Sequence, residues 1–251
     1  MNELNLKPIG YTGPLRLTSA AKVREWPEQA NGFALPAGNG ACPFATETCA
    51  KGCYAKKGRM AFSNVQKAFH RNFTALLEAG SPERMAELII DLLGWMKFRV
   101  FRIHVSGDFF SADYAEAWAM ACAEFPDREF WAYTRSRDAQ VLSILAGIPN
   151  LSIFLSADRD NWCSMLELSE RFPSFGLCYY TIGEDAPGAL YERGRLVPAG
   201  HPAGLVVFVD HPMRGKMNPK GACPVERARD PWRHEGACIR CRRCCGNGGE
   251  G

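Results

Sequence analysis

Three cysteines lie close together in the first quarter of the chain, at Cys42, Cys49 and Cys53. They have the spacing C-x6-C-x3-C, and the small and polar residues between them show no amphipathic period, which predicts a loop rather than a helix or strand. Such a loop can direct its thiolates toward one metal centre. Three thiolates are one short of the four that complete a structural zinc or iron–sulfur site. Either another segment supplies a fourth ligand, or one coordination position is left open for chemistry.

A second group of cysteines lies near the end of the chain. Cys223 is followed by a C-x2-C-x2-C pattern through Cys238, Cys241 and Cys244. The two short steps place thiolates on one tight turn, and the distant Cys223 completes a set of four. We therefore predict a metal site in this tail. Four thiolates suit both tetrahedral zinc and a four-iron cluster, so the identity of the metal is open.

The composition is typical of a globular protein that is not embedded in a membrane. The chain has 251 residues, 47% of them hydrophobic and 23% charged, with a formal net charge of +3 that neither requires nor excludes nucleic acid. No signal pattern follows Met1, and no apolar run approaches the length of a membrane span, so we expect a cytoplasmic protein. Clustered cysteines in a reducing compartment indicate metal rather than disulfides. The scattered Cys122, Cys163 and Cys178 are interpreted as small buried side chains.

The periodicity of the chain predicts three regions. Residues 1–41 are rich in proline and glycine and are expected to form an irregular lead-in. Residues 63–79 and 82–95 have helical periodicity, and from residue 98 strands alternate with helices. The expected strands are 99–105, 129–134, 150–155, 175–181 and 204–209, and the expected helices between them are 111–125, 138–146 and 160–171. This alternation predicts an α/β fold with a parallel sheet, a partial or full (β/α) barrel over 42–210, followed by a cysteine-rich tail over 211–251.

Polar residues follow every one of these strands. The strand ends carry Ser106-Gly107-Asp108, Thr134-Arg135-Ser136, Ser156-Ala157-Asp158, Thr181-Ile182-Gly183-Glu184 and Asp210-His211. In parallel α/β barrels the active site lies at the carboxyl ends of the strands. The sequence therefore predicts a polar pocket mouth at that edge, provided that the strands form one curved sheet.

The tail is also the most basic part of the chain. Arg240, Arg242 and Arg243 are interleaved with its cysteines. One interpretation is a solvated surface that compensates the negative charge of metal-bound thiolates. The other is a contact for nucleic-acid phosphate.

The chain resembles the phage "gene product eighty-eight" family of actinobacterial viruses, which has no settled function. The resemblance spans roughly residues 33 to 244. It rests on Leu35-Pro36-Ala37-Gly38, Cys42-Pro43, Cys49-x3-Cys53-Tyr54-Ala55, Arg71-Asn72, Arg102-Ile103-His104-x-Ser106-Gly107-Asp108-Phe109, Tyr133-Thr134 and the tail from Cys223-Pro224 to Cys244.

The order of these motifs is also similar to that of the phage three-Cys-motif proteins, which in turn look like radical S-adenosylmethionine enzymes such as spore photoproduct lyase. That resemblance implies a four-iron cluster on three cysteines, with one iron open to S-adenosylmethionine. It further implies that Ser106-Gly107-Asp108 contacts the methionine group of the cofactor. The usual spacing in that superfamily is C-x3-C-x2-C, and this chain departs from it.

The leading hypothesis is therefore a radical-SAM-like iron–sulfur enzyme acting on an unknown substrate, a nucleobase or nucleic acid being one candidate. In it Cys42, Cys49 and Cys53 hold the catalytic cluster, and the four tail cysteines hold an auxiliary cluster or a structural zinc. Asp108 anchors the cofactor. The residues expected to line the pocket are Tyr133, Arg135, Ser156, Asp158, Tyr180 and His211. Of these, Tyr133, Arg135 and Asp158 are, with Asp108, the expected catalytic residues, and Ser156 is an expected cofactor contact.

Two alternatives belong to other classes. The first is a barrel resembling tRNA-guanine transglycosylases, which combine a Ser-Gly-x-Phe strand end with a late zinc site; Asp108 or Asp210 would act as nucleophile or base. The second is a non-catalytic, metal-stabilised module that binds nucleic acid through the basic tail. The sequence does not specify the oligomeric state.

Overall fold

The computed structural model describes residues 8, 10–18, 31–38 and 40–181, together with three short strands at 189–192, 195–198 and 206–209. The predicted tail over 211–251 lies outside the described residues. Its four cysteines and the pocket candidate His211 therefore remain predictions from sequence. Within the described residues, no helix has both the length and the apolar character needed to cross a bilayer.

A seven-stranded sheet forms the centre of the molecule. Its order is β1-β2-β3-β4-β5-β6-β9, and every neighbouring pair is parallel except β1 and β2. The strands are β1 (Leu17–Thr18), β2 (Gly32–Ala34), β3 (Val100–Ser106), β4 (Glu129–Thr134), β5 (Leu151–Ala157), β6 (Gly176–Thr181) and β9 (Val206–Val209). A separate antiparallel pair is formed by β7 (Ala189–Glu192) and β8 (Arg195–Pro198). The predicted α/β class is thus confirmed.

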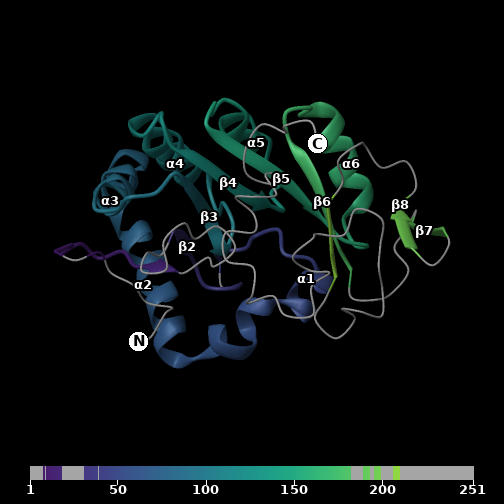
Figure 1. The fold of residues 1–251 in the computed structure, drawn as a ribbon, viewed down its shortest axis with the longest axis horizontal. Helices are drawn as coiled ribbons and strands as arrows, with labels where there is room; N and C mark the ends of the chain where they lie inside the picture. Colours follow the sequence, from purple (N-terminus) through teal and green to yellow (C-terminus); the bar gives the residue numbers. More distant parts are fainter. Residues whose placement is uncertain are drawn as a thin grey trace.

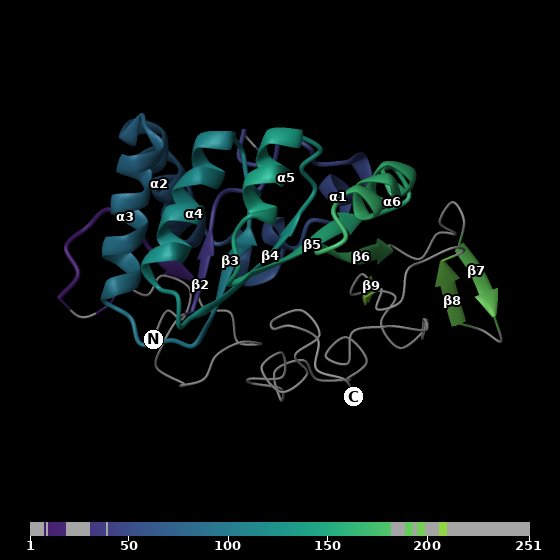
Figure 2. The ribbon, with the colours of Figure 1, turned by 90° about the horizontal axis from the view of Figure 1, so that it is seen from above.

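Four helices pack along one face of this sheet (Figures 1 and 2). They are α3 (Pro82–Gly94), α4 (Ala112–Glu124), α5 (Ala139–Ala146) and α6 (Trp162–Arg171). From β3 to β6 each strand pairs with the next strand in the chain, and one helix makes each crossover. This sequential winding places the crossover helices on the same side, as right-handed crossovers require. The described part of the sheet has two edges, at β1 and at β9.

The sequence sets the helix starts through side-chain caps. Ser81 accepts a hydrogen bond from the backbone N–H of Arg84, and Pro82 occupies the first turn of α3. Ser111 caps α4 in the same way, and Asp138 caps α5 through two backbone N–H groups. The expected helices and strands of residues 63–181 are confirmed, with boundaries shifted by no more than two residues.

The helix-covered face holds the main core. Its side chains alternate along the strands, and Phe101, Ile103, Phe130, Ala132, Ile153, Leu155, Leu177 and Tyr179 pack against apolar residues of α3 to α6. The opposite face carries a smaller cluster, in which Val65 and Phe69 of α2 (Ser63–Ala79) cover Ala34, Val100, Val105, Trp131, Phe154 and Cys178. We call these the outer and the inner face. The inner face is the side on which the cysteine segment lies (Figure 1).

A candidate site at the carboxyl edge of the sheet

A short helix, α1 (Glu47–Gly52), lies within the cysteine segment. The predicted loop is wrong for this stretch. Thr46 caps the helix, because its hydroxyl accepts a 3.0 Å hydrogen bond from the backbone N–H of Cys49. Six residues are too few to show a hydrophobic period, so the sequence pattern gave no helical signal. The local signals for this helix are Thr46 as the capping residue and the i,i+4 pair of Glu47 in the first turn with Lys51 in the last.

The three cysteines lie around α1. Cys42 precedes it, Cys49 lies within it and Cys53 ends it. All three are free thiols of intermediate exposure. The pKa of the Cys42 thiol is raised to about 11, chiefly by burial and to a smaller extent by Asp108, Cys49 and Cys53, while a backbone hydrogen bond with Gly38 lowers it. Across the described residues, no group of three or more His, Cys, Asp or Glu side chains has the geometry of a single-ion site.

Asp108 connects the end of β3 to the end of β4. Its Oδ1 atom accepts a 2.7 Å hydrogen bond from the hydroxyl of Thr134, and its Oδ2 atom accepts a 2.8 Å bond from the backbone N–H of Arg135. The backbone N–H of Phe109 donates a third bond to Oδ1. Burial raises the pKa of Asp108, and these hydrogen bonds oppose the rise. The Asp108 carboxylate therefore joins the end of β3 to the end of β4.

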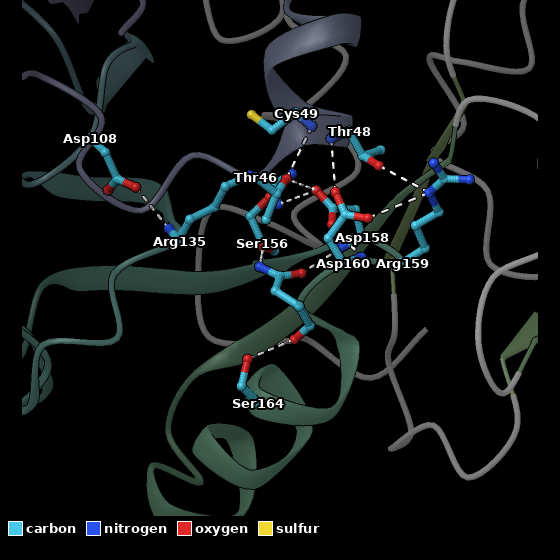
Figure 3. A network of polar contacts seen from close by, with 11 residues as sticks. Thr46, Thr48, Cys49, Asp108, Arg135, Ser156, Asp158, Arg159, Asp160 and Ser164 are labelled. Atoms are coloured by element: carbon cyan, nitrogen blue, oxygen red, sulfur yellow. Dashed lines mark hydrogen bonds and ion pairs between the residues drawn. The ribbon is translucent and has the colours of Figure 1, made fainter. Parts of the chain in front are cut away.

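Asp158 connects the ends of β4 and β5 to α1 (Figure 3). Its Oδ2 atom accepts a 2.6 Å bond from Nη1 of Arg135 and a 2.5 Å bond from the hydroxyl of Thr46. The Asp158 side chain is completely buried, and that of Arg135 is 9% exposed. A second bond from α1 reaches the same loop, where Asp160 accepts from the backbone N–H of Thr48 at 2.8 Å. The loop after β5 thus holds α1 in place.

Arg135 is the central charge of this arrangement. Burial on its own would lower the pKa of the guanidinium, but Cys49, Asp158, Cys178 and Asp108 raise it, so Arg135 is a cation at all relevant pH values. Conversely, burial raises the pKa of the Cys49 thiol, and Arg135 lowers it. In Figure 3 the sulfur of Cys49 points away from Asp158 and Asp160. A buried guanidinium beside this thiol stabilises negative charge there.

The turn after β3 brings the backbone close to β2. Gly107 has φ +87°, and a Cβ at this position would lie 2.5 Å from Cβ of Leu35. Glycine is therefore required both by conformation and by space. The preceding Ser106 is 7% exposed, and its hydroxyl has no hydrogen-bond partner among the described residues. A buried polar atom without a partner is costly, and Thr18 and Trp131 also carry one.

The inner face of the sheet also carries polar side chains. Arg102 lies over the rings of Trp131 and Tyr133, at 5.1 and 5.5 Å from their centroids, and donates to the Tyr54 hydroxyl at 3.2 Å. The Tyr180 hydroxyl donates to the carbonyl of Gly52 at 3.3 Å. These two contacts connect the cysteine segment to β3 and β6.

Among the described residues, hydrogen bonds join four of the predicted site residues. Asp108, Arg135 and Asp158 form one connected set, and Cys49 is joined to it through Thr46. The other predicted pocket residues, Tyr133, Ser156 and Tyr180, lie half-buried along β4 to β6. Sequence reasoning missed Thr46, Asp160 and Arg102, because their contacts join segments that are distant in the chain. Of the scattered cysteines, Cys122 and Cys178 are buried as predicted, and Cys163 is exposed.

Fold and site together define a class: an α/β protein with a cysteine-bearing segment held over the carboxyl edge of a sequentially wound parallel sheet. The chain belongs to the Gene product 88 family, whose model matches residues 5–246. It is similar to the Gene 88 protein of Mycobacterium phage D29, at 40% identity over 140 residues. It is likewise similar to the Gene 88 protein of Mycobacterium phage L5, at 39% identity over 140 residues.

These alignments cover 53% of this chain, 58% of the D29 protein and 59% of the L5 protein. The chain therefore aligns with less than two thirds of each relative. No solved structure matches.

Proposed function

We propose that this protein is an iron–sulfur enzyme of radical-SAM-like architecture, in which Cys42, Cys49 and Cys53 hold a four-iron cluster. The observation that carries the proposal is the position of α1, which bears Cys49 and is flanked by Cys42 and Cys53, all free thiols of intermediate exposure. Hydrogen bonds join this segment to the loop that follows β5, at the carboxyl edge of the parallel sheet. That edge is where parallel α/β folds place their active sites. The sequential order of β2 to β6 and β9, with α3 to α6 on one face, fits a partial (β/α) barrel open on its inner face.

The chemistry of three thiol ligands would suit such a cluster better than a single ion. A single ion requires all of its thiolates around one point, at about 2.3 Å for zinc. A four-iron cluster instead binds each thiolate through a different iron, so it accepts a wider triangle of sulfurs. Three cysteines leave one iron without a protein ligand. When bound, this group together with S-adenosylmethionine would supply reductive cleavage of the cofactor and so start a radical reaction.

The remaining site residues would bind and orient. Ser106 presents an unpartnered buried hydroxyl, which suits the polar methionine end of S-adenosylmethionine. Asp108 already accepts three hydrogen bonds, so we assign it to positioning Arg135 and the turn at Gly107. Arg135 would hold negative charge near Cys49, and Asp158 would hold Arg135 and Thr46. Tyr133 and Ser156 on the inner face would contact a substrate. An auxiliary cluster or a zinc on the four tail cysteines remains part of this proposal.

The phage relatives support a phage-encoded protein that works in the host cytoplasm. The bonding of Asp108 weighs against a transglycosylase in which Asp108 is the nucleophile, since a carboxylate that already accepts three hydrogen bonds is a weak one. Asp210, the other candidate of that alternative, lies outside the described residues.

The test is iron and acid-labile sulfide quantification on protein purified without oxygen. We expect the variant Cys42→Ala/Cys49→Ala/Cys53→Ala to lose about four irons per chain. The matched control is Cys163→Ala, which removes an exposed cysteine of α6 that is not a proposed ligand and should leave the iron content unchanged. A further variant lacking the four tail cysteines shows how much of the iron belongs to a second cluster. Colourless protein that contains only zinc would overturn the proposal.

If the cluster is present, reduced protein should cleave S-adenosylmethionine. Ser106→Ala should weaken binding of S-adenosylmethionine at unchanged iron content, because it removes a cofactor contact and no cluster ligand.

A further inference from the structure

A continuous stretch of the chain carries positive charge only. Residues 48–77 contain Lys51, Lys56, Lys57, Arg59, Lys67 and Arg71, and no Asp or Glu. The whole chain has 30 Lys and Arg against 27 Asp and Glu, so the charges are nearly balanced elsewhere. All six side chains are exposed. We call these six residues the basic surface.

The segment that carries the basic surface is held together by side-chain hydrogen bonds. It includes two 3-10 turns, η2 (Tyr54–Lys56) and η3 (Gly58–Ala61), and the start of α2. Gln66 on α2 donates to the carbonyls of Ala55 and Met60, at 3.1 and 2.7 Å. The two turns are therefore fixed against the helix, which sets the backbone positions of Lys56 and Arg59.

On α2 the charges lie on one face. Lys67 and Arg71 are four residues apart and so share a side of the helix. Val65 and Phe69 point the other way and are buried, at 1% and 0% exposure. The charged face therefore faces solvent, on the side of the sheet opposite α3 to α6 (Figure 1).

Two exposed aromatic rings lie within the same segment. The side chain of Tyr54 is 51% exposed and that of Phe62 is 57% exposed. Single exposed rings are ordinary on protein surfaces, so the relevant feature here is that two of them lie among basic side chains. Basic side chains interleaved with exposed rings are the combination that binds single-stranded nucleic acid, since cations contact the phosphates and rings stack on unpaired bases.

We propose that the basic surface, with Tyr54 and Phe62, binds single-stranded nucleic acid. Lys56, Lys67 and Arg71 contact phosphates, and Phe62 stacks on a base. Tyr54 immediately follows Cys53 and is bonded to Arg102 on the inner face, so a strand bound here passes beside the candidate site. The binding itself does not depend on iron.

An anionic membrane is the other polyanion that such a surface fits. Amphipathic helices bind lipid by inserting their apolar face. The apolar face of α2 is instead covered by the sheet, through Val65 and Phe69. The two exposed rings lie outside that face, so nucleic acid is the better match.

The experiment measures fluorescence anisotropy of labelled single-stranded DNA and RNA oligonucleotides with the full chain, over a series of salt concentrations. Lys56→Ala/Lys67→Ala/Arg71→Ala removes three phosphate contacts. Each contact contributes about 0.7 to the slope of log affinity against log salt for single strands, so the slope should become shallower by about 2. The matched control Arg84→Ala/Lys97→Ala/Arg171→Ala removes the same charge from exposed positions outside the segment, and its slope should stay nearly unchanged.

Phe62→Ala tests the stacking separately. We expect about 5- to 150-fold weaker binding of single strands, the range for loss of one base–aromatic stack, with the salt slope unchanged. Phe62→Leu keeps the apolar bulk without the aromatic face and should not restore affinity. Both DNA and RNA offer phosphates and unpaired bases, so the oligonucleotide that binds more tightly indicates which of the two is the natural ligand.

Three results would overturn the proposal. The first is equal loss of binding in the matched charge control, which would make the effect one of net charge. The second is binding abolished by Arg240→Ala/Arg242→Ala/Arg243→Ala and unaffected by the basic-surface variant, which would assign binding to the tail. The third is capture by phosphatidylserine vesicles without affinity for either oligonucleotide. Iron content is measured on each variant. A protein that contains no cluster and still binds the oligonucleotides would contradict the proposed enzyme and leave this binding proposal standing.

Discussion

The two faces of the sheet are built from the same strands and differ in almost every other respect. On the outer face, alternate residues such as Phe101, Phe130, Ile153 and Leu177 are at most 3% exposed and are covered by four helices. On the inner face, the residues between them include Arg102, Tyr133, Ser156 and Tyr180, all half-buried and polar. One helix, α2, covers only part of that face with apolar residues.

This difference separates stability from function along each strand. Apolar burial contributes about 25 cal/mol per Å², so the outer face supplies most of the folding free energy. Polar side chains on the inner face bury little apolar surface, so they add little to the folding free energy. The same alternation directs one set of side chains to the core and the other to the site.

The largest expected effect tests this division directly. Trp118 on α4 is 1% exposed and contacts Phe33, Phe101, Tyr114 and Phe130 on the outer side. Trp118→Ala should lower the free energy of unfolding by about 3–5 kcal/mol, because it leaves a cavity in this core. Tyr133→Ala on the inner face should cost only about 1–2 kcal/mol. Urea unfolding followed by circular dichroism measures both.

Equal losses for these two variants would contradict the comparison. They would mean that the inner face is a second core rather than a surface kept for binding. The slope of unfolding free energy against urea should be the same in both variants, since neither changes the surface exposed on unfolding by much.

The second effect concerns the buried pair at the edge of the sheet. Asp158→Asn removes the charge that faces Arg135 while it keeps the shape of the side chain, and should cost about 2–3 kcal/mol. Asp160→Asn is the matched control. Its side chain is 31% exposed, and asparagine keeps an oxygen that can accept the bond from Thr48, so the loss should be about 0.5 kcal/mol. If both variants melt at the same temperature, the ion pair is not a structural element of the edge.

The third effect is a dependence on pH. His104 is bonded to the Tyr114 hydroxyl at 3.0 Å, and burial lowers the pKa of its ring from 6.5 to about 3, with a smaller contribution from Arg102. Between these values the unfolded chain binds a proton that the folded chain excludes. Stability from this group is therefore complete above pH 6.5 and falls as the pH is lowered toward 3, by at most about 1.4 kcal/mol per pH unit.

The measurement compares the unfolding free energy of the wild type with that of His104→Gln between pH 4 and pH 7. Carboxylates titrate in both proteins, so the difference between the two curves isolates His104. Curves that stay parallel over this range would show that His104 is solvated in the folded state.

The sequence predicted the elements better than it predicted their contacts. The helices of residues 63–171 were recognisable because their apolar residues recur every three or four positions and because Ser81, Ser111 and Asp138 are good caps. Strand β2 lies inside the region expected to be an irregular lead-in. It was not recognised as a strand of the sheet, because three residues show no alternation. In the structure it pairs with β3.

The face of His104 could not be predicted for a specific reason. The pairing of β2 with β3 shifts in register, since Gly32 and Ala34 are opposite Arg102 and Ser106. The extra residues in β3 break the alternation, so both Ile103 and His104 contact the helix side. A bulge of this kind leaves no mark in local sequence.

The site was predictable residue by residue and not as a network. Asp108, Arg135 and Asp158 stand out because each follows a strand. Their contacts depend on strand order and register, because 50 residues separate the two carboxylates in the chain. Only the folded structure shows that Arg135 lies between the carboxylates.

The smallest expected effect concerns the hydrogen bond between the inner face of the sheet and α1. Tyr180 on the inner face of β6 holds α1 through a 3.3 Å hydrogen bond to Gly52. Tyr180→Phe should lower the free energy of unfolding by only about 1 kcal/mol, because one neutral hydrogen bond is lost at a half-exposed position. If α1 carries a cluster ligand, the same variant should lose iron to a chelator faster than the wild type. A large fall in stability with no change in iron release would place Tyr180 in the core instead, and the inner face would then contribute to folding more than its exposure indicates.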